Sequence, residues 1–517
     1  MAERPNVLMI ICDQLRADWL GYAGHPHVRT PNIDTLAARG TRFTNGFVAT
    51  PVCMPNRASI MTGRMPSVHG LRYNGCTLPA RVNTFVDVLR SGGYDTALIG
   101  KSHLEPFTGI RRVYDDGDEP VPIPEAWNDD DRDPTNEEPD RFEAEDDYRY
   151  PVPYYGFDHV DMVTDHGDRA NGHYRQWFRR TVPNWRELFD PANELPHSYT
   201  CPQAYRTPIP ANLYPTAYVA DRASRYLERA AGPGSGQPFF AFVSFPDPHH
   251  PFNPPGRYWE MYEPDAFEIP IRSGDHVSPP PPLSWCLRAR DAGEEPSTPQ
   301  SARAESDRHI REAMALSAGM ITMIDDAVGQ ILDTLRSTGL AEDTVVLFTS
   351  DHGDYLGDSH LLLKGAWSRD SINRIPLVWV DPDASGPEVR DDLVSSIDIA
   401  PTILHRVGIR PYHGMQGRSW MDSDSRDALL IEFNDPTARM GFSTPARVRT
   451  VRTRHHSLAL YGDQDWGELF DDESDPNHLN NLWDSAGHAK VKTTLLEQLG
   501  HLLTAQMDES PRALRQA

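Results

Sequence analysis

The sequence predicts an α/β protein with a large, mostly parallel or mixed central sheet flanked by helices, followed by a smaller α+β domain built on an antiparallel sheet. Strand and helix segments alternate over most of the chain. Several strand segments are continuously apolar, which is typical of strands buried on both faces. The last part of the chain instead contains closely spaced short strand segments, which favours antiparallel pairing.

The N-terminal elements follow one another in the order strand, helix, strand, helix, strand. The apolar run NVLMII predicts a buried strand over 6–11, and the segment after Thr30 predicts a helix that Gly40 ends. A short strand over 41–49 follows, then a helix closed by a Gly-Gly pair, then a strand over 95–100. This order favours parallel strands joined by crossover helices.

The same alternation continues in the middle of the chain. An amphipathic helix is expected over 215–230, a buried strand over 238–245, a long helix over 309–339 and a buried strand over 344–350. In a parallel sheet of this kind, ligands bind beyond the carboxyl ends of the strands. The residues that follow each strand are therefore the first candidates for a functional site.

Two segments break the alternation. The first, over 111–150, is rich in Asp, Glu and Pro, and the second, over 272–306, contains SPPPPL and little periodicity. We expect both to be long loops, and their composition leaves open whether they are disordered or shape a binding site. Short strands and a final helix follow, so we expect a catalytic domain over 1–421 and a small domain over 422–517.

Composition narrows the classes of partner. The chain has 517 residues, of which 38% are hydrophobic and 24% charged, as in a globular protein with a sizeable core. Its formal net charge of −25 repels phosphate backbones and anionic lipid surfaces, so we expect neither nucleic acid nor membrane as a partner.

The N-terminus and the cysteines indicate a reducing compartment. The first apolar run is short and lacks the basic start and cleavage site of a signal peptide, and no later run approaches the ~20 apolar residues of a membrane span. The five cysteines are widely spaced without a CxxC pair. We therefore expect a cytoplasmic protein.

Polar residues at two strand ends suggest a cation site. Asp13 and Gln14 follow the first strand, and Asp351 and His352 follow the strand over 344–350. Carboxylate and amide oxygens with an imidazole suit magnesium, calcium or manganese. Taken singly, each residue is more commonly a turn, a cap or a surface corner, so the prediction depends on their occurring together.

Basic and imidazole side chains occupy the other strand ends. Lys101 and His103 follow the strand over 95–100, His249 follows the strand over 238–245, and Lys364 follows the loop after Asp351. A lone lysine or histidine is usually a surface or core residue. Their shared position beside the predicted site makes them candidate anion ligands and acid–base groups.

Cys53 begins the segment CMPNRASIMTGR, just where a helix is expected to start. Such a cysteine can be a packing residue, a metal ligand, a thiolate nucleophile or the precursor of another group. The segment resembles the signature of the type I, formylglycine-dependent sulfatases of the alkaline phosphatase superfamily, in which Cys-x-Pro-x-Arg precedes Thr-Gly-Arg. Further segments resemble the family in the same order: RPNVLMIICDQ, TPNIDTLAARGTRFTNGF, GYDTALIGKSH, SFPDPHHPFNPP, TSDHGDYLGDSHLLLKG and GELFDDESDPNHLNNL.

The resemblance implies an alkaline phosphatase-like fold and a role for Cys53 as a precursor. A formylglycine-generating enzyme would oxidise Cys53 to Cα-formylglycine. One hydroxyl of the hydrated aldehyde would attack the sulfur of a small-molecule sulfate ester, and the other would expel sulfate. The metal would be bound by Asp13, Gln14, Asp351 and His352 together with residue 53.

The resemblance also implies the roles of the remaining side chains. Lys101 and Lys364 would offset negative charge on the sulfate oxygens, and Arg57 would orient the hydrated aldehyde. His103 would act as its base, and His249 would protonate or stabilise the leaving alkoxide. His250 and Asn74 are weaker candidates.

Two departures keep a second reaction open. Many sulfatases carry Asp in place of Gln14, and Asn or Gln in place of His352. The less anionic, softer donor set favours manganese somewhat over calcium. The same pattern resembles phosphonate monoester and phosphodiester hydrolases, whereas the GKSH segment with Lys101 and His103 favours a sulfatase.

A third reading, an inactive anion-binding relative, requires a damaged motif, and the motif here is intact. The sequence leaves the alcohol open, with residues over 148–178 as a candidate lining of its pocket. It also leaves open whether the chain forms a homo-oligomer, for which the C-terminal segment is a candidate interface.

Overall fold

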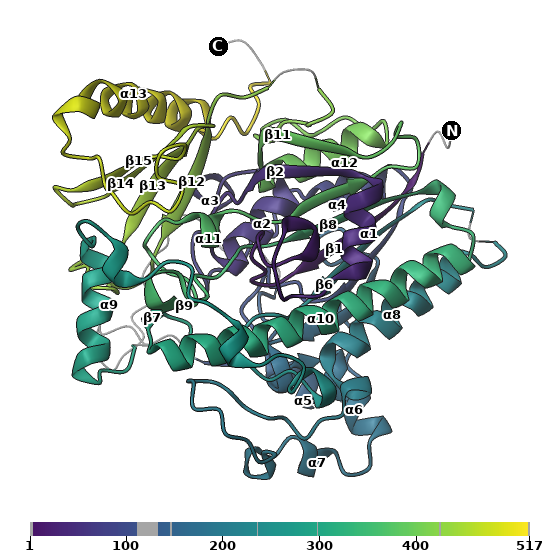
Figure 1. The fold of residues 1–517 in the computed structure, drawn as a ribbon. Coiled ribbons are helices and arrows are strands. Elements are labelled where there is room, and N and C mark those ends of the chain that lie inside the picture. The colour runs from purple at the N-terminus through teal and green to yellow at the C-terminus, as the bar shows by residue number, and fades with distance from the viewer. Residues whose placement is uncertain are drawn as a thin grey trace, which may run out of the picture.

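The computed structural model of the protein describes residues 4–110, 133–144, 147–234, 236–296, 298–422 and 425–514. A nine-stranded sheet with helices on both faces forms its main body, and a four-stranded sheet packs beside it (Figure 1). This architecture confirms the predicted fold class.

The centre of the large sheet consists of parallel strands. β1 (Asn6–Cys12) lies between β6 (Phe239–Phe245) and β8 (Thr344–Ser350), and β3 (Asp95–Gly100) pairs with β6. All seven residues of β6 and of β8 are buried, as the continuous apolar runs predict. The carboxyl ends of the four strands therefore meet at one edge of the sheet.

The outer strands make the sheet mixed. β10 (Leu377–Val380) runs antiparallel to both β8 and β2 (Thr41–Phe47), and β11 (Glu388–Ser395) pairs in parallel with β2. On the other side, β4 (His159–Thr164) is parallel to β3 and antiparallel to the short β5 (Asn171–Gly172). The strand order is β11-β2-β10-β8-β1-β6-β3-β4-β5.

Alternate residues of β1 divide between two hydrophobic layers. Leu8 and Ile10 pack with the layer that includes side chains of α1 (Pro31–Arg39), α8 (Pro215–Ala230) and α10 (Asp307–Ser337). Figure 1 shows α8 and α10 side by side across this face. Period-2 alternation along the strand thus supplies both faces of the sheet.

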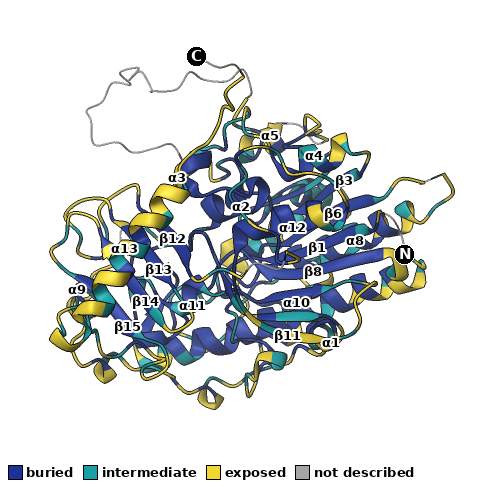
Figure 2. Ribbon diagram, turned by 90° about the horizontal axis from the view of Figure 1, so that it is seen from above, coloured by how far each residue is buried: buried dark blue, intermediate teal, exposed yellow. Residues whose placement is uncertain are grey.

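The opposite layer contains Val7 and Met9 with side chains of α2 (Cys53–Thr62), α4 (Phe85–Ser91) and α12 (Ile399–Arg406). Figure 2 shows the central strands and the inner sides of these helices as buried, with exposure confined to the periphery. Other short helices include α3 (Pro66–His69), α6 (His173–Thr181), α7 (Trp185–Leu188) and α11 (Asp370–Asn373).

Helix α10 is long and apolar enough to span a bilayer by length and composition. Within its most apolar stretch of 18 residues, 89% is buried inside the fold. Its Gly319 lies so close to the carbonyl of Tyr258 that an added Cβ atom would come within 2.2 Å of that oxygen. The helix therefore packs as a core helix, and its hydrophobicity is explained by that core.

The prediction of loops over 111–150 and 272–306 is wrong in part. The described residues of the first segment include α5 (Pro139–Ala144), and residues 111–132 and 145–146 lie outside the described part. The second segment contains α9 (Pro281–Ala292), whose first turn tolerates proline because its N–H groups need no helical acceptor. The short β7 (Arg303–Ala304) follows and pairs with β9 (Leu361–Leu362).

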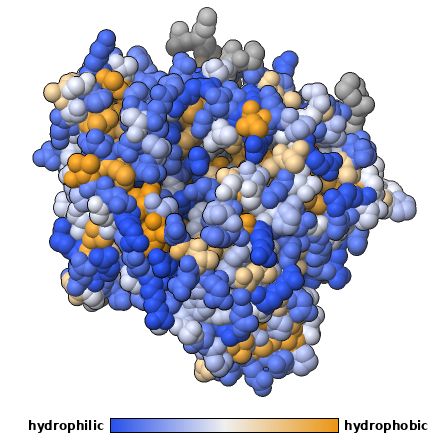
Figure 3. Space-filling view, viewed as in Figure 1, coloured by the Kyte–Doolittle hydropathy of each residue, from blue (hydrophilic) through white to orange (hydrophobic). Residues whose placement is uncertain are grey.

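The C-terminal strands form the predicted antiparallel sheet, in the order β12-β13-β14-β15. Helix α13 (Ala489–Ala505) covers one face of it, where Leu495 and Leu499 join the core (Figure 1). Figure 3 shows hydrophobic side chains as separate patches on a largely hydrophilic face, in keeping with the high charge content. The bounds of the four strands are Leu429–Asn434 for β12, Arg447–Arg452 for β13, His456–Tyr461 for β14 and Gly467–Asp471 for β15.

Candidate active site

The predicted site residues gather at the carboxyl edge of the central strands. Asp13 follows β1, Lys101 follows β3, His249 lies just after β6, and Asp351 follows β8. Each of these side chains is at most 1% exposed. Four segments far apart in the sequence thus place charged groups in one buried volume, which is costly unless the groups serve one another or a ligand.

Four side chains form a candidate metal centre: Asp13, Cys53, Asp351 and His352, whose ligand atoms lie within 4.8 Å of one another. His352 Nε2 is 3.0 Å from Cys53 Sγ, 3.6 Å from Asp13 Oδ1 and 3.7 Å from Asp351 Oδ1. Asp13 Oδ1 is buried and has no hydrogen-bond partner among the described residues. A carboxylate oxygen left in this state fits a divalent cation, as does the mixed O/N donor set.

Gln14 lies at the edge of this centre in a left-handed backbone conformation, with φ of 68°. Its backbone N–H donates to Asp351 Oδ1 at 3.0 Å, and its Nε2 donates to Asp354 Oδ2. Its Oε1 accepts a hydrogen bond from Lys364 Nζ. The amide oxygen proposed as a metal ligand is therefore also the anchor of a buried lysine.

Arg57 connects the strand ends rather than standing apart from them. Its Nε donates to Asp351 Oδ2 at 2.7 Å, and its Nη1 donates to the Lys101 carbonyl at 2.9 Å and to Ser244 Oγ at 2.8 Å. Both partners of the Arg57–Asp351 ion pair are fully buried. Because a buried guanidinium needs several acceptors, these contacts fix the start of α2, and with it Cys53, against the sheet.

Lys101 is buried between a carboxylate and an imidazole. Its Nζ donates to Asp13 Oδ2 and to His166 Nε2. His166 was not predicted from the sequence. A usable signal exists, because His166 follows β4 within Asp165-His166-Gly167-Asp168, which repeats the DHGD of 351–354.

Lys364 and His249 contact each other within the site. Lys364 Nζ lies 3.2 Å from His249 Nε2, and His249 Nδ1 lies 2.6 Å from the carbonyl oxygen of His250. Burial, reinforced by His166, His250 and Lys364, holds the pKa of His249 well below its usual range. His250 stacks on His249 with ring centroids 3.9 Å apart, so it lies behind the ring.

His103 is held by a carboxylate that the sequence did not single out. Glu137, from the acidic segment, accepts backbone N–H groups of residues 103, 104 and 105. The His103 ring stacks on Phe107, with centroids 4.0 Å apart, and its buried Nδ1 has no hydrogen-bond partner within the described ranges. Burial first, and then the charge of Lys101, lowers its pKa well below the usual range. The described part of the acidic segment therefore shapes the site.

Cys53 is the first residue of α2 and is 1% exposed. Burial, reinforced by the charge of Asp13, raises the pKa of its thiol to about 12. Since a cysteine nucleophile needs an accessible thiolate, this environment argues against a thiolate mechanism. Asn74 accepts the backbone N–H of Met54 at 3.2 Å, which places it beside the same turn of helix.

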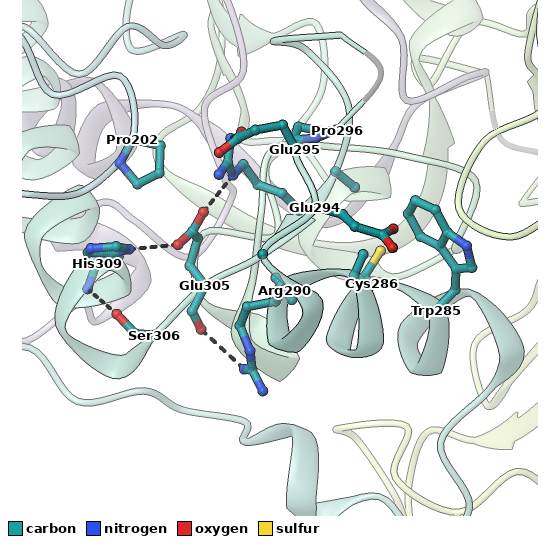
Figure 4. Close-up of a pocket in the computed structure, with 15 residues that line it drawn as sticks. Pro202, Trp285, Cys286, Arg290, Glu294, Glu295, Pro296, Glu305, Ser306 and His309 are labelled. Atoms are coloured by element: carbon teal, nitrogen blue, oxygen red, sulfur yellow. Dashed lines mark hydrogen bonds and ion pairs between the residues drawn. The ribbon is translucent and has the colours of Figure 1, made fainter.

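A separate cavity of about 320 Å³ lies between α9, β7 and the start of α10 (Figure 4). In the described part of the chain, none of the predicted site residues lines it. Glu305 accepts from Arg303 and lies 2.7 Å from His309 Nδ1, so its charge is compensated. The cavity is joined to the segment that carries Lys364 by the backbone, where the N–H of Ala302 donates to the Lys364 carbonyl.

Comparisons with known proteins agree with this geometry. Residues 5–409 match the Sulfatase family, and residues 362–505 match the C-terminal family of N-sulphoglucosamine sulphohydrolase. An arylsulfatase of Clostridium perfringens is 26% identical, over 93% of this chain and 91% of that protein. A multifunctional alkaline phosphatase superfamily protein of Trinickia caryophylli is 28% identical, over 94% and 93%.

Among solved structures, the phosphonate monoester hydrolase of Agrobacterium radiobacter superposes with a TM-score of 0.77 at 25% identity, covering 98% of this chain and 97% of that one. The similarity thus extends over both sheets and not only over the signature segment. Because the family match covers most of the sequence, the chain belongs to the sulfatase family of sulfuric ester hydrolases, within the alkaline phosphatase superfamily.

Proposed function

We propose that the protein hydrolyses sulfate monoesters to an alcohol and inorganic sulfate. The observation that carries this proposal is the position of Cys53, from the signature segment, inside a buried cluster of metal-ligand side chains. Buried ammonium groups beside a cation site suit a small, oxygen-rich anion. Family membership and the arylsulfatase relative support the assignment, and aryl, alkyl and sugar sulfates all belong to this substrate class.

Two groups beyond the unmodified chain belong to the proposal. Asp13, Asp351, His352 and residue 53, with Gln14 at the edge, would hold a divalent cation (Ca²⁺, Mn²⁺ or Mg²⁺), which supplies Lewis-acid polarisation of a sulfate oxygen. A formylglycine-generating enzyme would convert Cys53 to Cα-formylglycine, which supplies one hydroxyl for attack on sulfur and a second for release of sulfate. The unpartnered oxygen of Asp13 supports the cation, and the signature segment CMPNRASIMTGR supports the conversion of Cys53.

The chain's own side chains then have separate tasks. Lys101 and Lys364 would compensate negative charge on the sulfate oxygens. His103, whose Nδ1 is buried without a described partner, takes the proton of the second hydroxyl. Lys364 provides the proton for the leaving oxygen, and His249, whose Nε2 lies 3.2 Å from Lys364 Nζ, orients that ammonium group. Arg57 keeps Asp351 and the start of α2 in place.

The first prediction concerns maturation. When the chain is expressed with a formylglycine-generating enzyme, mass analysis of the peptide that contains Cys53 is expected to show an aldehyde that reacts with hydrazides. Expression without that enzyme is expected to lower turnover in proportion to conversion, because only the modified residue carries two hydroxyls. Full activity from a chain whose Cys53 is entirely unmodified would rule out the aldehyde mechanism.

A phosphonate monoester or phosphodiester hydrolase is the second candidate function. The superposition on a phosphonate monoester hydrolase at 25% identity favours it, as does the presence of Gln14 and His352 after the two strands that end at the site. Against it stand Lys101 and His103, both buried just beyond the end of β3, in the GKSH segment that resembles sulfatases. The two candidates differ in the charge and the substituents of the group attacked.

The ranking of substrates separates the two candidates. We expect p-nitrophenyl sulfate to be hydrolysed with a higher kcat/KM than phenyl phosphonate esters or bis-aryl phosphates. Some activity toward all three is expected, because the same buried cations stabilise charge on non-bridging oxygens in each reaction. Steady-state rates on one fully matured preparation provide the comparison, and the reverse ranking would promote the second candidate.

A further inference from the structure

We infer that His166 is a positioning residue that aligns two groups of the proposed sulfatase reaction, Lys101 and His249. The inference rests on the proposed function and adds to it a residue that lies outside the short segments quoted above for their resemblance to sulfatases. His166 comes from the segment after β4, and its side chain is 4% exposed. It lies between Lys101 on one side and the ring of His249 on the other.

The first contact fixes the ammonium group of Lys101. Lys101 Nζ lies 2.5 Å from His166 Nε2 and also donates to Asp13 Oδ2. A lysine ammonium has three donors and no acceptor, so Nε2 must be the acceptor and the ring proton must be on Nδ1. Nδ1 lies 3.2 Å from Asp165 Oδ1, which can receive that proton in a hydrogen bond.

With two of its three donor directions used by Asp13 and His166, Lys101 keeps one for a ligand. The side chain of Lys101 is a flexible four-carbon chain and is 0% exposed. Without the imidazole, Nζ can swing toward Asp13 alone and neutralise a carboxylate that is proposed to hold the cation. His166 therefore directs the third N–H of Lys101 into the site.

The second contact fixes the plane of the His249 ring. The rings of His166 and His249 stack with centroids 3.6 Å apart and an interplanar angle of 13°. His250 stacks on His249 at 3.9 Å and 27°, so His249 lies in the middle of three rings. Because a ring held on both faces cannot tilt, the direction of His249 Nε2, which lies 3.2 Å from Lys364 Nζ, depends on His166.

The two contacts can be removed one at a time. A glutamine at position 166 places an amide oxygen near the position of Nε2 and can accept from Lys101, but it offers no ring to His249. A phenylalanine at position 166 keeps a flat ring against His249 but has no acceptor for Lys101. An alanine removes both contacts, so the three variants separate the two parts of the proposal.

The experiment compares His166→Gln, His166→Phe and His166→Ala with the wild type on aryl sulfates of increasing leaving-group pKa, from p-nitrophenyl to phenyl sulfate. For His166→Phe we expect a roughly hundredfold loss in kcat/KM that is the same for every ester. The misplaced Lys101 ammonium group acts on the sulfate group, which all the esters share. For His166→Gln we expect less than about tenfold loss with p-nitrophenyl sulfate and roughly a hundredfold with phenyl sulfate, because only poor leaving groups need the acid. His166→Ala is expected to combine both losses.

Metal content, conversion of Cys53 and the thermal unfolding midpoint are measured on every variant. The matched control is His159→Gln, which changes a partly exposed histidine at the start of the same strand and should leave all rates unchanged. Unchanged kcat/KM in the Gln and Phe variants, or equal dependence on leaving-group pKa in both, would overturn the role of His166 while the wild type still hydrolyses sulfates. A matured, metal-loaded wild type that hydrolyses no sulfate ester overturns the proposed function itself, and the role of His166 with it.

Discussion

Replacing Cys53 with serine is expected to turn a multiple-turnover enzyme into one that releases at most one equivalent of alcohol. The serine hydroxyl would lie at the first residue of α2, beside Asp13 and His352, where it can still attack sulfur at a reduced rate. It lacks the second hydroxyl on the same carbon, whose deprotonation would expel sulfate. The sulfated serine is therefore expected to accumulate.

The measurement is a rapid-mixing time course of alcohol release with enzyme at micromolar concentration, followed by mass analysis of the peptide around residue 53. The host must be one that leaves serine at this position unmodified. Cys76→Ser serves as the control. Cys76 is a half-buried cysteine outside the cluster, so its substitution should leave turnover intact. Sustained turnover by the Cys53→Ser variant, with the serine confirmed as unmodified, would mean that water attacks the sulfated intermediate directly.

The site residues predicted from the sequence could be predicted for one physical reason. Asp13, Lys101, His249 and Asp351 each follow a strand whose apolar run is unmistakable, and the ends of parallel strands must meet. This conclusion did not require the exact boundaries of the strands. What remained open from the residues alone was the chemistry of Cys53, which the resemblance to a family supplied.

His166 and Glu137 were missed because their roles depend on long-range contacts. His166 follows β4, near the edge of the sheet, and only the sheet order places it against Lys101. Glu137 belongs to an acidic segment whose composition resembles that of a solvated loop, although its carboxylate is buried against backbone N–H groups.

Two details of the fold could not be predicted from the sequence, for local reasons. The direction of β10 is not encoded in its four residues, since an apolar run reads the same in parallel and antiparallel strands. Helix α9 begins within a run of prolines, which normally indicates a loop. Proline breaks helices only beyond the first turn, and Pro281 and Pro282 both lie inside that turn.

Replacing Asp351 with asparagine is expected to remove the bound cation and to lower kcat by at least about a thousandfold, the several kcal/mol that a catalytic cation contributes. Asparagine keeps the shape of the side chain but loses the negative charge that Asp351 shares between the cluster and Arg57. The substitution is also expected to cost stability, on the order of 3–5 kcal/mol, because Arg57 keeps a buried charge with one carboxylate fewer. Metal per chain, kcat and the free energy of unfolding are the three measurements.

Loss of activity through instability must be separated from loss through the missing cation. Asp398→Asn is the matched control, because Asp398 is a 3% exposed carboxylate that accepts two hydrogen bonds from Arg426, at 2.7 and 2.8 Å, and is not a member of the cluster. We expect this variant to lose comparable stability while keeping one metal ion per chain and full kcat at temperatures where it is folded. If Asp351→Asn instead retains the metal and most of its activity, the cation lies elsewhere, and the cluster around Cys53 owes its burial and its unpartnered oxygen to another cause.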